Sequence, residues 1–349
     1  MTQGLVEPLF TGPLDLVGDI HGELDALHAL LARLGYDRHG EHRHGRRLVF
    51  VGDLCDRGPD SPGVVRFVQR LVERELAQCL LGNHELNLLR GRRKHGNHWF
   101  FGETSPALEA EFGVLVPAGD GEADALAAFM AQLPIALERA DLRVVHAAWL
   151  DDVIAACRGR TDPALDAHVW FDRRALASAS GARLKAARDD EYLRHAAALT
   201  NPGERPPLLP ALAAYDEHRQ MSNPVRIATS GVERVTARPF FAGGKWRFVE
   251  RVPWWRDYDD PVPVVFGHYW RCWDPAGHAA LSKGEPNLFE GDAPDGWQRN
   301  AAGAEVAICI DYSVGARFKE RRTGRRAGFA GRLAALRWPE RTLVFDADA

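Results

Sequence analysis

Three short segments rich in aspartate and histidine follow one another near the start of this 349-residue chain. They read Gly18-Asp19-Ile20-His21-Gly22, Gly52-Asp53-Leu54-Cys55-Asp56-Arg57-Gly58 and Gly82-Asn83-His84-Glu85. Carboxylate oxygens and imidazoles hold divalent metal ions, and a pair of such ions can generate hydroxide for attack on phosphorus. The ordered set therefore predicts a two-metal centre that hydrolyses phosphate esters.

The first two segments offer ligands for one ion and a bridge to a second. Asp19 and His21 lie one residue apart and can both turn toward one ion, while Asp53 is the natural bridging carboxylate. Asn83 adds a neutral oxygen donor for the second ion, whose shell two later histidines at predicted strand ends would complete. The expected metal ligands are Asp19, His21, Asp53, Asn83, His146 and His268.

The remaining polar side chains of these segments suit the phosphate and its proton. His84 follows the ligand Asn83, so we expect it to face the substrate and to protonate the leaving alkoxide. Asp56 would orient the imidazole of His84 and keep it cationic. Arg57 has the planar fork that holds a phosphoryl group bidentately.

Apolar runs that end at the motifs predict the strands that position them. Helical spacing of leucine and valine between the runs predicts a β-loop-α repeat, in which ligands gather at the carboxyl ends of the strands. The predicted helices are 23–34, 64–75 and 126–133. The predicted strands are 14–17, 48–51, 79–81, 142–145, 225–228, 246–249, 262–266, 306–310, 333–336 and 342–345.

Residues 151–222 differ in composition from the rest of the chain. They are rich in alanine, arginine and aspartate, suggest helices, and contain breaker runs such as Asn201-Pro202-Gly203. We expect a helical insertion or cap here, within one domain that spans residues 1–349. The charged run Arg90, Arg92, Arg93, Lys94 is either a solvated face or a rim that attracts an anionic substrate.

The three motifs resemble the signature of the serine/threonine phosphoprotein phosphatase family of metallophosphoesterases. The resemblance implies an α/β (α+β) fold of the calcineurin-like type, a two-sheet β-sandwich flanked by helices with a helical insertion. It also implies that the ligand set given above holds the two ions. A second phosphate-binding arginine is expected before the last histidine, and both Arg226 and Arg238 qualify.

The end of the chain resembles bacterial diadenosine-tetraphosphatase-like members of the same family. The similar segments are Ile308-Cys309-Ile310-Asp311 and Gly331-Arg332-Leu333-Ala334-Ala335-Leu336. Asp56 is evidence against this substrate class, because the symmetrical tetraphosphatases tend to carry alanine at this position. The leading prediction is hydrolysis of phosphomonoesters, and the alternative is hydrolysis of dinucleoside polyphosphates. A catalytically silent scaffold is a third hypothesis, which the intact motifs disfavour.

Composition limits the partners. A formal net charge of −4 predicts no general attraction to nucleic acid or to anionic membranes, and no stretch approaches the roughly twenty apolar residues of a membrane span. Five cysteines without C-x-x-C spacing suggest free thiols, so we expect a cytoplasmic protein, and alanine and arginine usage hints at a bacterial source. The expected cofactors are two divalent ions, Mn²⁺ or otherwise Fe, Zn, Ni or Mg, and the expected substrate is a phosphoprotein or a nucleotide.

Overall fold

Two β-sheets form the centre of the protein in the computed structural model, which describes residues 4–94, 96–242, 244–273, 287–293 and 295–347. The first sheet has the strand order β1-β5-β6-β9-β11-β10, with bounds Val6–Pro8, Ala136–Arg139, Leu142–Val145, Val264–Phe266, Glu305–Cys309 and Trp297–Arg299. The second has the order β12-β13-β2-β3-β4, with β14 beside β13, and bounds Asp311–Tyr312, Arg332–Trp338, Leu14–Val17, Arg47–Phe50, Ala77–Cys79 and Thr342–Phe345. Strands β2, β3 and β4 are parallel, whereas β13 runs antiparallel to β2.

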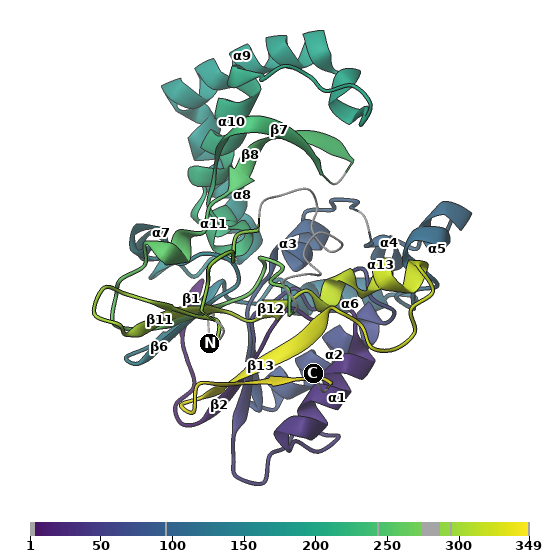
Figure 1. Cartoon of the computed structure of the whole chain (residues 1–349), viewed down its shortest axis with the longest axis vertical. Coiled ribbons are helices and arrows are strands. Elements are labelled where there is room, and N and C mark those ends of the chain that lie inside the picture. Colours follow the sequence, from purple (N-terminus) through teal and green to yellow (C-terminus); the bar gives the residue numbers. More distant parts are fainter. Residues whose placement is uncertain (1–3, 95, 243, 274–286, 294, 348–349) are drawn as a thin grey trace.

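Alternating side chains along the strands pack the two sheets together. Leu14 and Leu16 of β2 are buried in one cluster with Val265 and Ile308, which belong to the other sheet. The next residue, Val17, points to the opposite face and lies in the cluster that the outer helices cover. The expected two-sheet sandwich flanked by helices is confirmed, and Figure 1 shows α1 and α2 beside the second sheet.

Helices α1 (Leu24–Leu34) and α2 (Ser61–Glu73) connect the parallel strands of the second sheet. Helix α1 ends at Gly35, whose φ of 94° suits a residue without a Cβ, and α2 begins where the Asp60 side chain accepts the N–H of Gly63. The other helices outside the insertion are α3 Asn83–Leu89, α4 His98–Phe101, α5 Pro106–Phe112, α6 Glu122–Met130 and α13 Arg317–Arg322. Short 3₁₀ turns occupy Ala198–Thr200, Trp254–Arg256 and Val314–Ala316.

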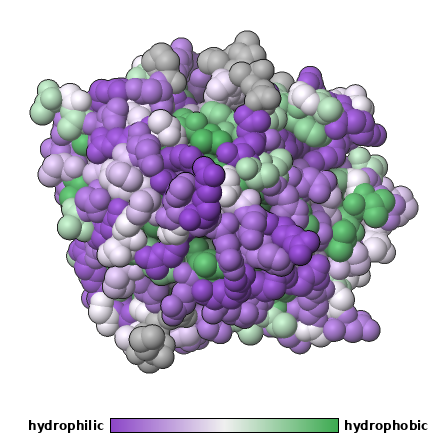
Figure 2. Space-filling model, turned by 90° about the horizontal axis from the view of Figure 1, so that it is seen from below, coloured by the Kyte–Doolittle hydropathy of each residue, from purple (hydrophilic) through white to green (hydrophobic). Residues whose placement is uncertain are grey.

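The face of the protein drawn in Figure 2 is mainly hydrophilic, with hydrophobic residues in separate groups. Among the helices that the structure describes, none combines the length and the apolar character that a membrane crossing requires. Large apolar side chains that are exposed include Val114, Trp170 and Leu193, which belong to a loop and to two different helices.

The expected insertion is helical and is longer than the sequence indicates. Its helices are α7 Asp151–Cys157, α8 Ala164–Ala177, α9 Ala179–His195, α10 Pro210–Met221 and α11 Pro224–Ser230. A hairpin of β7 (Glu233–Ala242) and β8 (Lys245–Arg251) follows and forms a sheet of its own. Figure 1 shows α9, α10 and this hairpin standing away from the two central sheets, and we call residues 151–251 the cap.

The strand predicted for residues 225–228 is wrong, because these residues lie in helix α11. The Asn223 side chain accepts the N–H groups of Val225 and Arg226, and Pro224 occupies the first turn. An asparagine cap followed by proline is a strong start signal for a helix. Here it prevails over the β-preference of the short apolar run.

Candidate active site

The motif loops follow the carboxyl ends of neighbouring strands, and backbone hydrogen bonds join them. The N–H groups of Ile20 and His21 donate to the carbonyl of Asp53, at 3.0 and 2.9 Å. His21, Asp53 and His268 all have positive φ, with values of 49°, 49° and 72°. A residue with a side chain adopts this conformation at a cost of about 1–2 kcal/mol, so the surrounding bonds must hold these turns in place.

Two glycines leave room for the carboxylates. A Cβ on Gly82 would lie 2.3 Å from Oδ1 of Asp53, and a Cβ on Gly267 would lie 2.1 Å from Oδ1 of Asp19. Neither glycine has a positive φ, so their role is close approach rather than an unusual turn. Both positions therefore need glycine because a side chain would collide with a carboxylate of the site.

His21, Asp19 and Asp53 form a first group of expected metal ligands. Nε2 of His21 lies 3.9 Å from Oδ2 of Asp19 and 3.8 Å from Oδ2 of Asp53. Nδ1 of His21 lies 3.0 Å from the carbonyl of Cys55, so this nitrogen carries the hydrogen and Nε2 is left as the donor atom for a metal ion. One divalent ion between these three side chains would meet two carboxylate oxygens and one imidazole nitrogen.

Asp53 also reaches a second group through its other oxygen. Oδ1 of Asp53 lies 3.5 Å from Nε2 of His146, which is 3.4 Å from Oδ1 of Asn83. Nδ1 of His146 donates to the carbonyl of Val51 at 2.8 Å, which turns Nε2 toward the site. Ligand atoms of Asp53, His146 and His268 all lie within 4.8 Å of one another. Asp53 is thus placed between two groups of donors, as expected of a bridging carboxylate.

The charges of these buried carboxylates fit bound cations. Burial and then repulsion from Asp311 raise the pKa of Asp19 well above its ordinary value. Burial also acts to raise the pKa of Asp53, but the imidazoles of His146 and His84 outweigh it and hold that pKa well below the usual range. Divalent ions would offset the repulsion between the carboxylates, and the imidazole nitrogens would coordinate them. The donor set therefore fits a pair of divalent metal ions.

His84 and Asp56 form a buried pair beside the first group. Nδ1 of His84 lies 2.6 Å from Oδ2 of Asp56, and Nε1 of Trp99 donates to Oδ1 of Asp56 at 2.8 Å. Burial raises the pKa of Asp56 well above its ordinary value. The contact places the hydrogen of the ring on Nδ1 and turns Nε2 toward the site, so a proton taken up at Nε2 would give an imidazolium ion beside Asp56.

Arg57 lies between two imidazoles at the centre of the site. Its Nη1 is 2.8 Å from Nε2 of His21, and its Nη2 is 2.8 Å from Nε2 of His84. The guanidinium also lies over the ring of Trp270, 4.8 Å from its centroid. His84 is close enough to His21 and Asp53 to be counted with them as a metal ligand, so the geometry permits that role beside the proton-donor role predicted from the sequence.

Comparison with known proteins agrees with this geometry. Residues 12–182, which contain the three motifs and His146, match the sequence profile of the family described as calcineurin-like phosphoesterases. The chain contains a calcineurin-like metallophosphoesterase domain.

Relatives match over only part of this chain. The chain is 46% identical over 80 residues to a bis(5'-nucleosyl)-tetraphosphatase PrpE [asymmetrical] of Oceanobacillus iheyensis, covering 22% of this chain and 32% of that protein. It is 42% identical over 106 residues to the protein of the same name from Halalkalibacterium halodurans, covering 28% and 43%. The chain thus spans less than half of the length of these relatives. A solved structure of a cold-active protein-tyrosine phosphatase of Shewanella sp. is similar over 98% of this chain and 82% of that one, with 16% identity and a TM-score of 0.45.

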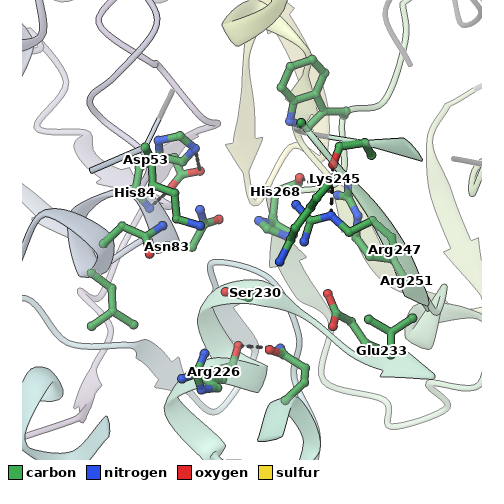
Figure 3. A pocket seen from close by; sticks show the side chains of 18 of the residues that line it. Asp53, Asn83, His84, Arg226, Ser230, Glu233, Lys245, Arg247, Arg251 and His268 are labelled. Carbon is green, nitrogen blue, oxygen red and sulfur yellow. Dashed lines mark hydrogen bonds and ion pairs between the residues drawn. The ribbon is translucent and has the colours of Figure 1, made fainter. Parts of the chain in front are cut away.

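The site of the phosphoesterase domain opens into a cleft of about 720 Å³ that the cap helps to enclose. Its wall includes Asp53, Asn83 and His84 from the core and His168 and Arg219 from the cap. Among the described residues that line it, nine are lysine or arginine and four are aspartate or glutamate. Figure 3 shows Asp53, Asn83 and His84 on one side of the cleft, and His268 with the cationic side chains of the hairpin on the other.

The structure separates the two candidates for a second phosphate-binding arginine. Arg226 lines the cleft, whereas Arg238 is exposed on β7 and is not among the described residues that line it. Asp172 of α8 holds Arg226 through two contacts, Nε to Oδ1 at 2.9 Å and Nη2 to Oδ2 at 2.7 Å. Arg226 is therefore the better placed of the two, and its contact with phosphate remains a prediction.

Two buried acids support the site and were not assigned a role from the sequence. Glu85, the last residue of the third motif, accepts the N–H groups of Asp53 at 2.9 Å and Leu54 at 2.8 Å, and so holds the loop that carries Asp53 in place. Asp311 accepts the N–H of Trp270 at 2.8 Å and shapes the loop that follows His268. Their only signal in the sequence is an acid beside a motif or at the end of an apolar strand.

Proposed function

We propose that this chain is a metal-dependent phosphohydrolase with two divalent ions bridged by Asp53. The observation that carries the proposal is the opposite placement of the two Asp53 oxygens, 3.8 Å from His21 on one side and 3.5 Å from His146 on the other. A pair of divalent ions supplies hydroxide near neutral pH by lowering the pKa of a shared water. Mn²⁺ is the ion we expect, in a protein that acts in the cytoplasm.

The chain's own residues would bind the phosphate and supply the proton. Arg57, and Arg226 from the cap, would neutralise the phosphoryl oxygens and hold the phosphoryl group in a fixed orientation beside the metal ligands. Nε2 of His84 would protonate the leaving oxygen, while Asp56 stabilises the imidazolium before transfer. The 2.6 Å contact between His84 and Asp56 supports a substrate whose leaving group is an alkoxide, so phosphomonoesters of the serine/threonine phosphatase type are the leading substrates.

A second candidate function is the hydrolysis of a dinucleoside polyphosphate. The excess of cations in the cleft favours a substrate with several phosphates, and the similar proteins named above are tetraphosphatases. The cap forms part of the wall of the cleft, which favours a small substrate over a folded phosphoprotein.

A substrate panel tests both candidates. The purified chain is stripped with a chelator, reloaded with Mn²⁺, and assayed on a phosphopeptide, p-nitrophenyl phosphate and diadenosine tetraphosphate. The proposal expects hydrolysis only after reloading, and loss of both activity and bound metal in Asp53→Asn. Turnover of the tetraphosphate orders of magnitude above the other substrates would replace the leading substrate class with the second. Metal-independent hydrolysis, or full activity in Asp53→Asn, would contradict the proposed function itself.

A further inference from the structure

A row of cations follows one face of β8 in the cap. Successive side chains of a strand point to opposite faces, so Lys245, Arg247, Val249 and Arg251 share one face, and all four line the cleft. Figure 3 shows the labelled cations of this row on the wall that faces Asp53 and the other core residues. We call Lys245, Arg247 and Arg251 the cationic track.

The opposite face of β8 keeps the track turned toward the cleft. Phe248 is 1% exposed and packs in a cluster with Leu199, Leu209, Leu212 and Ala213 of the cap. Exposure of a buried phenylalanine side chain to water is unfavourable. A slip of one residue in the register would expose Phe248 and bury Arg247 in its place, so the packing of the cap fixes the direction of the cations.

The track leads away from the metal centre. Nη1 of Arg251 donates to the carbonyl of His268 at 3.3 Å, which places this end of the track beside an expected metal ligand. Lys245 lies six residues earlier on the same strand, and at ~3.3 Å per residue the track spans ~20 Å. A substrate whose reacting phosphate lies at the metal centre could therefore extend along the track.

A further cation faces the outer end of the track. Lys94, which follows α3, lines the same cleft, and its pKa is lowered to about 8 by burial and then by the positive charges of Arg247 and Lys245. The carboxylates Asp216 and Glu233 also line the cleft, and Glu233 is the strand partner of Arg251. Burial raises the pKa of Asp216, which weakens its ability to balance the lysines and arginines. Converging cations repel one another, and an anionic ligand between them would offset that cost.

We propose that the cationic track and Lys94 form a second anion subsite, which binds phosphate groups of the substrate beyond the one that is cleaved. This inference rests on the proposed function, since it takes the metal centre as the place of cleavage. Between the two substrate classes proposed above, the subsite favours the second, molecules with a chain of phosphates, over the leading one, single phosphomonoesters. The leaving group would lie along β8, and its length would be recognised by charge rather than by base-specific contacts.

Direct binding tests the subsite without relying on turnover. The metal-loaded chain is titrated by calorimetry with a methylene-bridged analogue of tripolyphosphate and, separately, with inorganic phosphate, at a fixed concentration of free metal. The test variant is Lys245→Ala/Arg247→Ala. The matched control is Arg234→Ala on the same hairpin, because Arg234 is exposed, bonds to Glu250 at 2.9 Å and is not among the described lining residues.

We expect the double variant to weaken binding of the tripolyphosphate analogue by ~tenfold or more, as the loss of two charge-assisted contacts implies. The Kd of inorganic phosphate should change far less, Arg234→Ala should bind both ligands as the parent does, and Lys245→Arg/Arg247→Lys should restore most of the affinity. Equal losses for both ligands, or no loss for the longer one, would overturn the subsite. A chain that binds the analogue through the track but hydrolyses no phosphate ester would contradict only the proposed function.

Discussion

Replacement of Asp56 by asparagine tests the role of the His84–Asp56 pair in proton transfer. The substitution keeps the shape of the side chain and an oxygen that can accept the N–H of His84, but it removes the negative charge that stabilises the imidazolium. Asp56 is fully buried, so water cannot replace that charge. We therefore expect a slower chemical step with little change in substrate binding.

The expected magnitude follows from the contact itself. A hydrogen bond to a charged partner contributes ~1.5–3 kcal/mol and an ordinary one ~1 kcal/mol, so the 2.6 Å contact should lose ~0.5–2 kcal/mol. At 1.36 kcal/mol for each factor of ten, kcat should fall ~2- to 30-fold. His84→Asn removes the proton donor altogether, and its loss should reach ~10²–10⁴-fold. In the His84→Asn background, the Asp56→Asn substitution should add little.

The assay compares two leaving groups under saturating substrate. An alkyl phosphate needs a proton on its leaving oxygen, whereas p-nitrophenolate leaves without one, so Asp56→Asn should slow the alkyl ester far more than the aryl ester. Trp99→Phe is the control, since it removes the second hydrogen bond to Asp56 and keeps the charge. Equal losses for both esters in Asp56→Asn would refute the proton-donor role of His84 and would favour the alternative that His84 binds metal.

Two further predictions concern metal binding and acid stability. Gly267→Ala places a Cβ 2.1 Å from Oδ1 of Asp19, so metal titration should show at least ~tenfold weaker binding, while Gly203→Ala, where the nearest atom is 3.4 Å away, should bind metal normally. Burial, followed by the charges of Arg226 and Arg90, lowers the pKa of His168 to about 3. Between about pH 6.5 and pH 3 this imidazole is therefore protonated in the unfolded chain but neutral in the folded one. The free energy of unfolding should thus fall as pH decreases through this window, by up to ~1.4 kcal/mol per pH unit from this group, and urea titrations should show a flatter pH dependence in His168→Gln. An unchanged slope in that variant would show that His168 does not contribute.

Many strands of the two central sheets, and the ligands at their ends, could be predicted because short stretches of sequence specify them. The apolar run predicted as a strand at residues 14–17 coincides with β2, and that at 142–145 coincides with β6. Each run ends at a glycine or histidine that begins a motif loop, so strand end and ligand are specified within a few residues. His146 and His268 are brought to the same site because β6 and β9 pair in parallel.

Only helices and strands could be predicted for the cap, because the way they pack depends on contacts between distant residues. The pattern around Arg226 and Arg238 does not distinguish them, since the choice is made by Asp172, more than fifty positions earlier in the chain. Residues 246–249 were predicted as a strand and lie in β8, yet the alternation of cationic and apolar residues does not say which face meets the cleft. That is decided by the cluster around Phe248.

The division between core and cap has a consequence for substrate choice. The ligands that would activate water are fixed by strand ends and by Glu85, none of which belongs to the cap. The position of Arg226, in contrast, depends on the cap. Asp172 holds Arg226, and Asn223, which caps α11, donates to Asp172 at 2.7 Å. Changes in the cap should therefore alter which phosphate compound binds while leaving metal binding intact. Substitutions at Asp172 should raise KM without displacing the ions. Substitutions at Glu85 should weaken metal binding without raising KM.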